Sequence, residues 1–123
     1  MLTSAIVHAQ SPSITIGSKS FTESVILGAI LTGLAKDTSA SVNRHKQLGG
    51  TRILWNALLR GEINAYPEYT GTIAREILVK QKITSRKAMI DALPSQGISM
   101  SAPLGFNNTY ALAVTAKTAK KIP

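Results

Sequence analysis

The chain has no cysteine, which excludes disulfide bonds and thiolate metal sites within its 123 residues. Its two histidines, His8 and His45, lie far apart and have no carboxylate neighbours in sequence. Zinc sites need clustered ligands, so we expect no metal and no other cofactor. The longest apolar run, Val25 to Leu31, is much too short to span a bilayer.

Acidic residues are also few. The chain has six Asp and Glu residues and fourteen Lys and Arg residues, which gives a net charge of +8. The densest basic group lies within the polar stretch at residues 80–87. Surfaces that bind single-stranded nucleic acid place aromatic residues between the basic ones, and this stretch has no aromatic residues. We therefore favour a solvated basic face and expect no nucleic-acid partner. A basic nucleic-acid or anionic-surface binding module is kept as the alternative function.

Residues 1–11 are mildly apolar and end in Val7-His8-Ala9 before Gln10. This pattern is typical of the end of a secretory signal and its cleavage site, although the basic beginning is missing and the apolar part is short. We interpret residues 1–11 as a signal-peptide remnant. This interpretation predicts a periplasmic or other extracytoplasmic location.

The remaining chain alternates between short β-branched runs and helical spacing. Strands are expected near residues 14–16, 41–48, 63–66, 98–104 and 110–115, and helices near 21–36, 52–60, 72–80 and 86–93. Strands separated by helices predict an α/β fold with a mostly parallel sheet and helices on both faces. No linker divides the chain, and the polar run at 41–48 is expected near an edge of the sheet.

The first expected helix has two sequence features of its own. Ser20-Phe21-Thr22-Glu23 fits a capping box, with Ser20 as N-cap and Glu23 reaching back to it. Apolar residues cover most of the circumference, so the helix is expected to be largely buried. Gly28 and Gly33 within it predict close packing on the sheet.

Residues 66–72 contain two of the six aromatic residues of the chain, Tyr66 and Tyr69. Pro67 favours an extended Tyr66, and helical spacing follows Thr72. The stretch is therefore expected to be a strand end, a turn and a helix start, which is where open α/β sheets bind ligands. The alternative is an ordinary turn with one tyrosine in the core and the other on the surface.

Three turns, at residues 17–20, 49–51 and 68–72, each lead from an expected strand into a helix N-terminus. Parallel strands bring such turns to one edge of the sheet, where free backbone N–H groups can donate hydrogen bonds to an anion such as a carboxylate. None of the turns has the spacing of a phosphate-binding P-loop. No arrangement of serine, histidine and acid suggests nucleophilic catalysis, so the chain is not expected to be an enzyme.

Four motifs occur in a fixed order along residues 14–115. They are Gly-Ser-Lys-x-Phe-Thr-Glu at 17–23, Leu-Gly-Gly-Thr at 48–51, Tyr-Pro-Glu-Tyr-Thr-Gly-Thr at 66–72 and Gly-Phe-Asn-Asn-Thr-Tyr-Ala-Leu-Ala-Val at 105–114. Together they closely resemble the substrate-binding proteins of osmoprotectant ABC importers. Proteins of that family bind glycine betaine, choline, carnitine and related quaternary amines, and deliver them to a membrane permease.

The resemblance implies one lobe of a type II periplasmic-binding-protein fold. Residues 12–115 would form the ligand-binding lobe and residues 116–123 a truncated crossover tail, and the second lobe of the family would be absent. Such a lobe would expose the face that its partner lobe normally covers. We therefore expect a tendency to form a homodimer, through this exposed lobe face or by exchange of the C-terminal segment.

The resemblance also implies a site for a quaternary ammonium ligand. Tyr69 and Tyr110 would be walls of an aromatic cage, held to the cation by cation–π attraction. Lys19 and Thr72 resemble the residues that hold the carboxylate of the ligand. Asn108 would make a polar contact near the cage without supplying a counter-charge. Tyr66 and Glu68 are expected to have structural roles, Tyr66 as part of the core.

Overall fold

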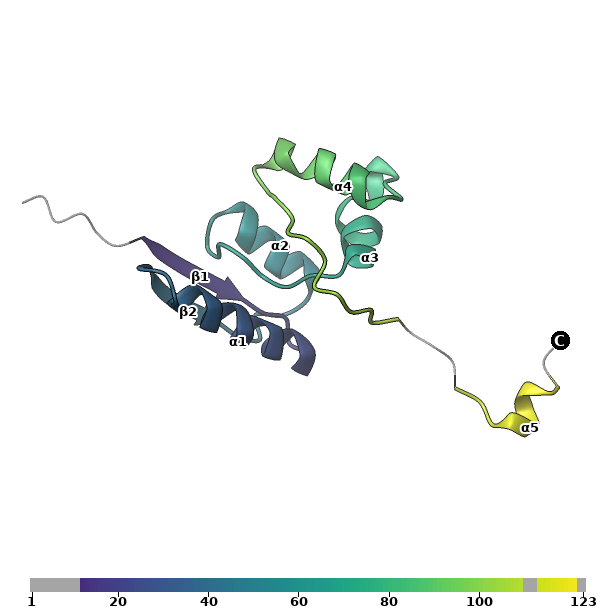
Figure 1. Cartoon of the computed structure of the whole chain (residues 1–123). Helices are drawn as coiled ribbons and strands as arrows, with labels where there is room; N and C mark the ends of the chain where they lie inside the picture. Colours follow the sequence, from purple (N-terminus) through teal and green to yellow (C-terminus); the bar gives the residue numbers. More distant parts are fainter. Residues whose placement is uncertain (1–11, 110–112, 122–123) are drawn as a thin grey trace, which may run out of the picture.

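The computed structural model describes residues 12–109 and 113–121 (Figure 1). The expected signal-peptide remnant at 1–11 lies outside the described residues, as do Tyr110 and the two residues after it. The described part is an α/β structure with a parallel sheet, as the alternation of elements predicted. Among the described residues, no helix combines the length and the apolarity needed to cross a bilayer.

The sheet has two strands in the described residues, β1 (Ser13–Gly17) and β2 (Ser41–His45), paired in parallel with Ile14 opposite Val42. The chain predicted as a third strand, at 63–66, makes only a single parallel bridge between Ile16 and Ala65. Asn64 explains this difference. Its side-chain Oδ1 accepts the N–H of Thr15 at 2.7 Å, so a side chain takes the place of a regular ladder bond.

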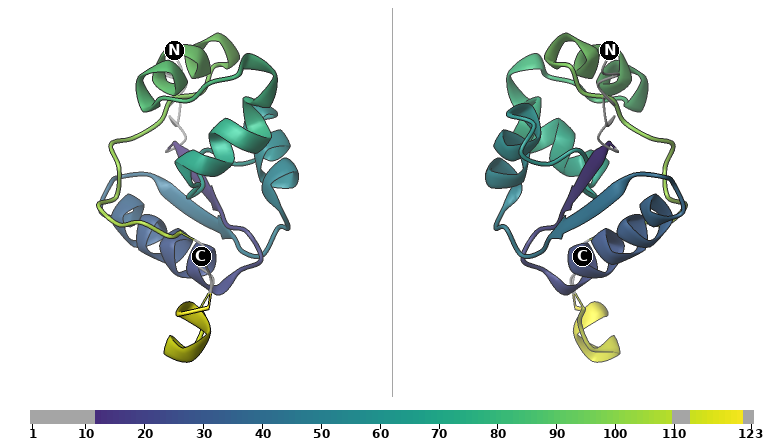
Figure 2. Two further views of the ribbon diagram at one scale, coloured as in Figure 1. Left: turned by 90° about the vertical axis from the view of Figure 1, so that its right-hand side faces the viewer. Right: turned by 90° about the vertical axis from the view of Figure 1, so that its left-hand side faces the viewer.

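Two helices lie on opposite sides of this sheet, α1 (Thr22–Lys36) and α2 (Thr51–Leu59) (Figure 2). The residue types at the C-terminal end of α2 explain why the helix stops there. Arg60 is its C-cap, and Gly61 adopts a positive φ of 72°, which favours glycine. The expected edge position of β2 is also observed, since its only strand partner in the described sheet is β1.

The orientation of α1 contradicts the prediction of a largely buried helix. Its buried face is a row of small residues, Ser24, Gly28 and Thr32, whereas Ile26, Ile30 and Leu34 are each more than half exposed. Small side chains are needed in this row because α1 lies very close to the chain that follows β1. A Cβ added at Gly28 would lie 3.1 Å from the Cβ of Ser18.

The predicted capping box at the start of α1 is also wrong. Phe21 is the N-cap, and no side chain caps the helix there. Glu23 instead accepts a hydrogen bond from Asn108, 85 residues away. A distant side chain has thus replaced the local bond that the motif predicted.

The chain after residue 69 is less regular than predicted. One helix was expected at 72–80, but three short pieces form: α3 (Thr70–Thr72), the π-helix η1 (Ile73–Ile77) and the 3₁₀-helix η2 (Val79–Gln81). The helix α4 (Arg86–Ala92) confirms the helix expected near 86–93. Ser85 caps it by accepting the N–H of Ala88 at 3.2 Å. The 3₁₀-helix η3 (Leu93–Gln96) then extends it through Pro94.

The last part of the chain forms no strand among the residues that the structure describes. Residues 98–104, predicted as a strand, form no regular secondary structure and lead from η3 toward α1 (Figure 2). A short helix, α5 (Ala116–Ala119), follows residue 115, and Thr115 caps it. The predicted strand at 110–115 lies partly outside the described residues.

The buried side chains form two clusters, both of which include residues of α2. One joins α2 to the helical region that follows it: Trp55, Ile73, Leu78, Met89 and Leu93. The other consists of Leu54, Ala57 and Ile63, with Tyr66 packed against it. A Cβ at Gly17 would lie 2.7 Å from Ile63 Cδ1, so the end of β1 needs glycine to sit against this second cluster. This packing fixes where the turn after β1 begins.

Candidate functional site

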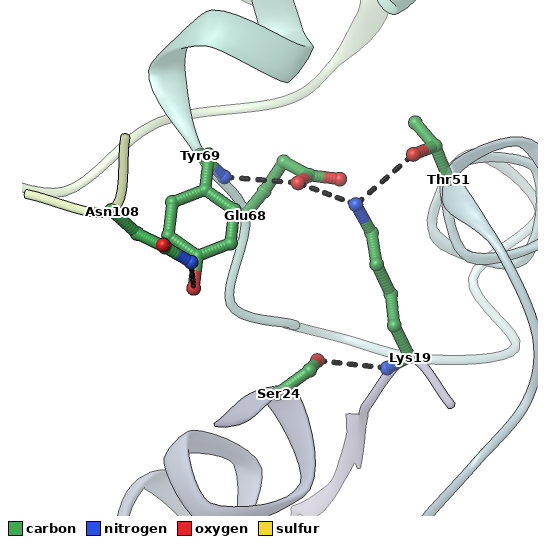
Figure 3. A network of polar contacts seen from close by, with 6 residues as sticks. All are labelled: Lys19, Ser24, Thr51, Glu68, Tyr69 and Asn108. Carbon is green, nitrogen blue, oxygen red and sulfur yellow. Dashed lines mark hydrogen bonds and ion pairs between the residues drawn. The ribbon is translucent and has the colours of Figure 1, made fainter. Parts of the chain in front are cut away.

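The three turns predicted to share one edge of the sheet do meet. Lys19, from the turn after β1, places its Nζ 2.6 Å from Glu68 Oε1 and 3.0 Å from Thr51 Oγ1 (Figure 3). Thr51 begins α2, and Glu68 precedes α3. One ammonium group therefore joins all three strand-to-helix turns.

The backbone around Lys19 is held as firmly as its side chain. The N–H of Lys19 donates to Ser24 Oγ at 2.9 Å. On either side, the N–H of Ser18 donates to His45 O and the N–H of Ser20 donates to Gly49 O. The turn at 17–20 is thereby bonded to α1, to the end of β2 and to the segment that follows β2.

The ion pair between Lys19 and Glu68 is buried, with side chains only 3% and 6% exposed. Glu68 Oε1 also accepts the backbone N–H of Tyr69 at 2.9 Å, whereas Oε2 is buried and has no hydrogen-bond partner among the described residues. Burial, with the negative charge of Glu68 as the next cause, raises the pKa of Tyr66 above its ordinary value of 10.0. Glu68 thus organises the interior, which agrees with its expected structural role.

A second, more exposed group of side chains adjoins this pair. Asn108 Nδ2 lies 3.2 Å from the hydroxyl of Tyr69 (Figure 3). The same nitrogen lies 2.8 Å from Glu23 Oε2. Burial raises the pKa of the Tyr69 hydroxyl, and the Glu23 carboxylate raises it further. We call Glu23, Tyr69 and Asn108 the rim of the site.

The structure brings three of the five predicted site residues into one network. Tyr69 and Asn108 are hydrogen-bonded on the rim, and Lys19 reaches Tyr69 through Glu68. Thr72 ends α3 and takes no part in this network within the described residues. Tyr110, the second tyrosine of the predicted aromatic cage, lies outside the described residues.

Sequence reasoning missed three contributors to the site. Thr51 stands in the Leu-Gly-Gly-Thr motif, which was a signal that could have identified it. Ser24 had no comparable signal, because its partner is a backbone N–H in a turn of unknown shape. Glu23 had a misleading signal, since its spacing from Ser20 fits a capping box.

The chemistry available at this edge is that of binding. The buried part is an ion pair of zero net charge, and the rim offers an aromatic ring, an amide and a carboxylate. Within the described residues, no cluster of three or more His, Asp or Glu side chains could hold a metal ion. A ring with a carboxylate beside it is a suitable environment for an organic cation.

Comparison with known proteins identifies the family of the chain. Residues 12–123 match the model of the OpuAC family, described as the substrate binding domain of ABC-type glycine betaine transport systems. The chain belongs to this family. The match covers nearly the whole chain and confirms the resemblance drawn from the four motifs.

Individual relatives carry related names. The chain is 30% identical over 123 residues to the glycine betaine-binding protein YehZ of Escherichia coli K12, with 94% of this chain and 40% of the relative covered. It is 32% identical to a glycine-betaine-binding protein of Pseudomonas aeruginosa, with 93% and 38% covered.

A third relative is named for a different ligand. The chain is 32% identical over 112 residues to the ergothioneine transport permease/ergothioneine binding protein EgtU of Helicobacter pylori, with 88% of this chain and 20% of that protein covered. The chain therefore spans between 20% and 40% of the length of these relatives.

Proposed function

We propose that this chain binds a quaternary ammonium osmoprotectant of the glycine betaine or choline type for uptake by an ABC importer. Family membership supports the transport role, and the observation that carries the ligand class is the rim. A trimethylammonium group has no N–H to donate, so proteins hold it by ring faces and nearby negative groups. Tyr69 and Glu23 provide a ring and a negative group within one hydrogen-bonded cluster.

The residues proposed to contact the ligand are those implied by the family motifs. Tyr69 and Asn108 would contact the ammonium group from the rim, and Tyr110 would add a second ring. Lys19 and Thr72 are the candidates for a ligand carboxylate. For Lys19 this role requires a carboxylate that shares or replaces Glu68, because the ammonium group is already paired.

The wider assembly is likewise a proposal. We propose that residues 12–115 act as one lobe of a type II periplasmic-binding-protein fold outside the cytoplasm, and that residues 116–123 begin a crossover. The partner would be the membrane permease of the importer. Exposed apolar side chains in the last part of the chain, Leu104, Phe106 and Val114, support self-association, which light scattering would detect.

Titration of the isotope-labelled chain with glycine betaine and with choline, followed by ¹H–¹⁵N NMR, tests the binding function. We expect shifts centred on Tyr69 and Asn108. Tyr69→Ala should weaken binding by about 2- to 30-fold, because one cation–π contact contributes about 0.5–2 kcal/mol. Tyr69→Phe keeps the ring and is the matched control. Absence of shifts with both ligands at millimolar concentration would refute the proposal.

A further inference from the structure

The buried charges at this edge cancel one another. Lys19 and Glu68 are in contact at 2.6 Å, and both side chains are withdrawn from solvent. Thr51 accepts a further hydrogen bond from the same ammonium group. An ammonium group that touches a carboxylate acts at longer range as a dipole, so Lys19 adds no net positive charge to the rim.

Glu23 leaves one negative charge on the rim. Its Oε2 is hydrogen-bonded to Asn108, which is neutral, and Asn108 is bonded in turn to the neutral hydroxyl of Tyr69. The ion pairs of the described residues are Lys19–Glu68, Arg60–Glu62 and Lys87–Asp91, and none of them includes Glu23. In a chain with a net charge of +8, this is a local exception beside the ring of Tyr69.

We infer that Glu23 is the counter-charge for the bound ammonium group, and that the site selects a singly charged cation of the choline type over a zwitterion of the glycine betaine type. This inference rests on the proposed function. The positive charge of choline is attracted to Glu23, and its hydroxyl needs no cationic partner. The carboxylate of glycine betaine is repelled by Glu23 and finds Lys19 already occupied by Glu68.

The position of Glu23 suits this role. It lies in the first turn of α1, where the positive end of the helix dipole stabilises a carboxylate without neutralising it. Asn108 bridges the carboxylate and the Tyr69 hydroxyl, so that the charge lies near the edge of the ring that carries the hydroxyl.

The test compares choline and glycine betaine on the full chain by ¹H–¹⁵N NMR titration. The unaltered chain should bind choline more tightly. Glu23→Gln keeps the size of the side chain and an acceptor for Asn108 but removes the charge. It should lower the affinity for choline about fivefold, which is the effect of one unit charge at contact distance in water. The affinity for glycine betaine should stay the same or increase.

Glu62→Gln is the matched control, because it removes the same charge from an exposed pair with Arg60 beyond the C-terminal end of α2. It should change neither affinity. If the unaltered chain binds neither ligand, the proposed function fails and this inference fails with it. If both ligands bind but glycine betaine binds more tightly, or Glu23→Gln leaves the ratio of the two affinities unchanged, the proposed function stands and this inference is overturned.

Discussion

Lys19 Nζ and Glu68 Oε1 are 2.6 Å apart in the fold although their residues are separated by 49 positions in the sequence. The two groups come from different strand-to-helix turns, so their contact depends on the assembled sheet edge. A buried pair of this kind costs desolvation of both ions, and removal of one partner leaves the other charge buried alone. The pair is therefore a sensitive probe of the site.

Lys19→Met should lower the free energy of unfolding by about 3–5 kcal/mol, because it leaves the Glu68 carboxylate buried without its cation. Urea denaturation followed by circular dichroism measures the change. The double variant Lys19→Met/Glu68→Leu removes both charges and should recover most of the loss.

The control for this prediction is Lys87→Met, which breaks the exposed pair with Asp91 in α4. Its urea midpoint should match that of the unaltered chain. Equal effects of Lys19→Met and Lys87→Met would show that the buried pair does not hold the turns together.

Ser24→Ala should destabilise the chain by about 1–3 kcal/mol, because it leaves the buried N–H of Lys19 without an acceptor. Ser20→Ala removes the serine that the sequence pattern named as helix cap but that caps nothing in the fold. It should stay within about 0.5 kcal/mol of the unaltered chain. Thermal melting of both variants measures the two losses of stability. A larger loss for Ser20→Ala than for Ser24→Ala would support the predicted capping box.

Two glycines of α1 should respond oppositely to alanine. Gly33 has no atom within 4 Å of an added Cβ, so Gly33→Ala should stabilise by about 0.5–1 kcal/mol through helix propensity. At Gly28 the new methyl would meet Ser18, and overpacking costs about 1–3 kcal/mol. Gly28→Ala should therefore be the less stable variant in urea, and the reverse order would argue against the close approach of α1.

The free energy of unfolding should fall as the pH rises above 10. The pKa of Tyr66 is raised in the folded chain, so the unfolded chain loses this proton first and is favoured at alkaline pH. The stabilisation is complete below pH 10 and is lost as the pH approaches the folded value. Urea midpoints of the unaltered chain and of Tyr66→Phe between pH 8 and pH 11 measure this loss of stability. A variant with the same alkaline slope would contradict the prediction.

Local sequence was enough to predict those parts of the fold that local interactions determine. Ser85 caps α4 and Gly61 follows the C-cap of α2, and both are residue types that commonly occupy these positions. The convergence of three turns at one edge followed from the parallel arrangement of strands and helices. The helix ends depend on local interactions, whereas the convergence of the turns follows from the parallel topology.

Long-range contacts account for the predictions that failed or were incomplete. The apolar residues of α1 are spread around its circumference, so its sequence pattern could not show that Ser24, Gly28 and Thr32 form the buried face. Glu23 could satisfy a cap or a distant amide, and only the fold chooses Asn108. Likewise, Lys19 was predicted as a ligand residue, but its pairing with Glu68 depends on residues that the sequence does not place together.

The difference in burial between the two charged parts of the site determines how each responds to dissolved salt. Ions screen exposed charges over roughly 8 Å at physiological ionic strength but reach a buried pair much less. The Lys19–Glu68 contact should therefore keep the geometry of the turns as salinity rises, while the attraction of Glu23 for a cation weakens. A protein of an osmoprotectant family would then retain its site during osmotic stress and lose only part of its discrimination between ligands.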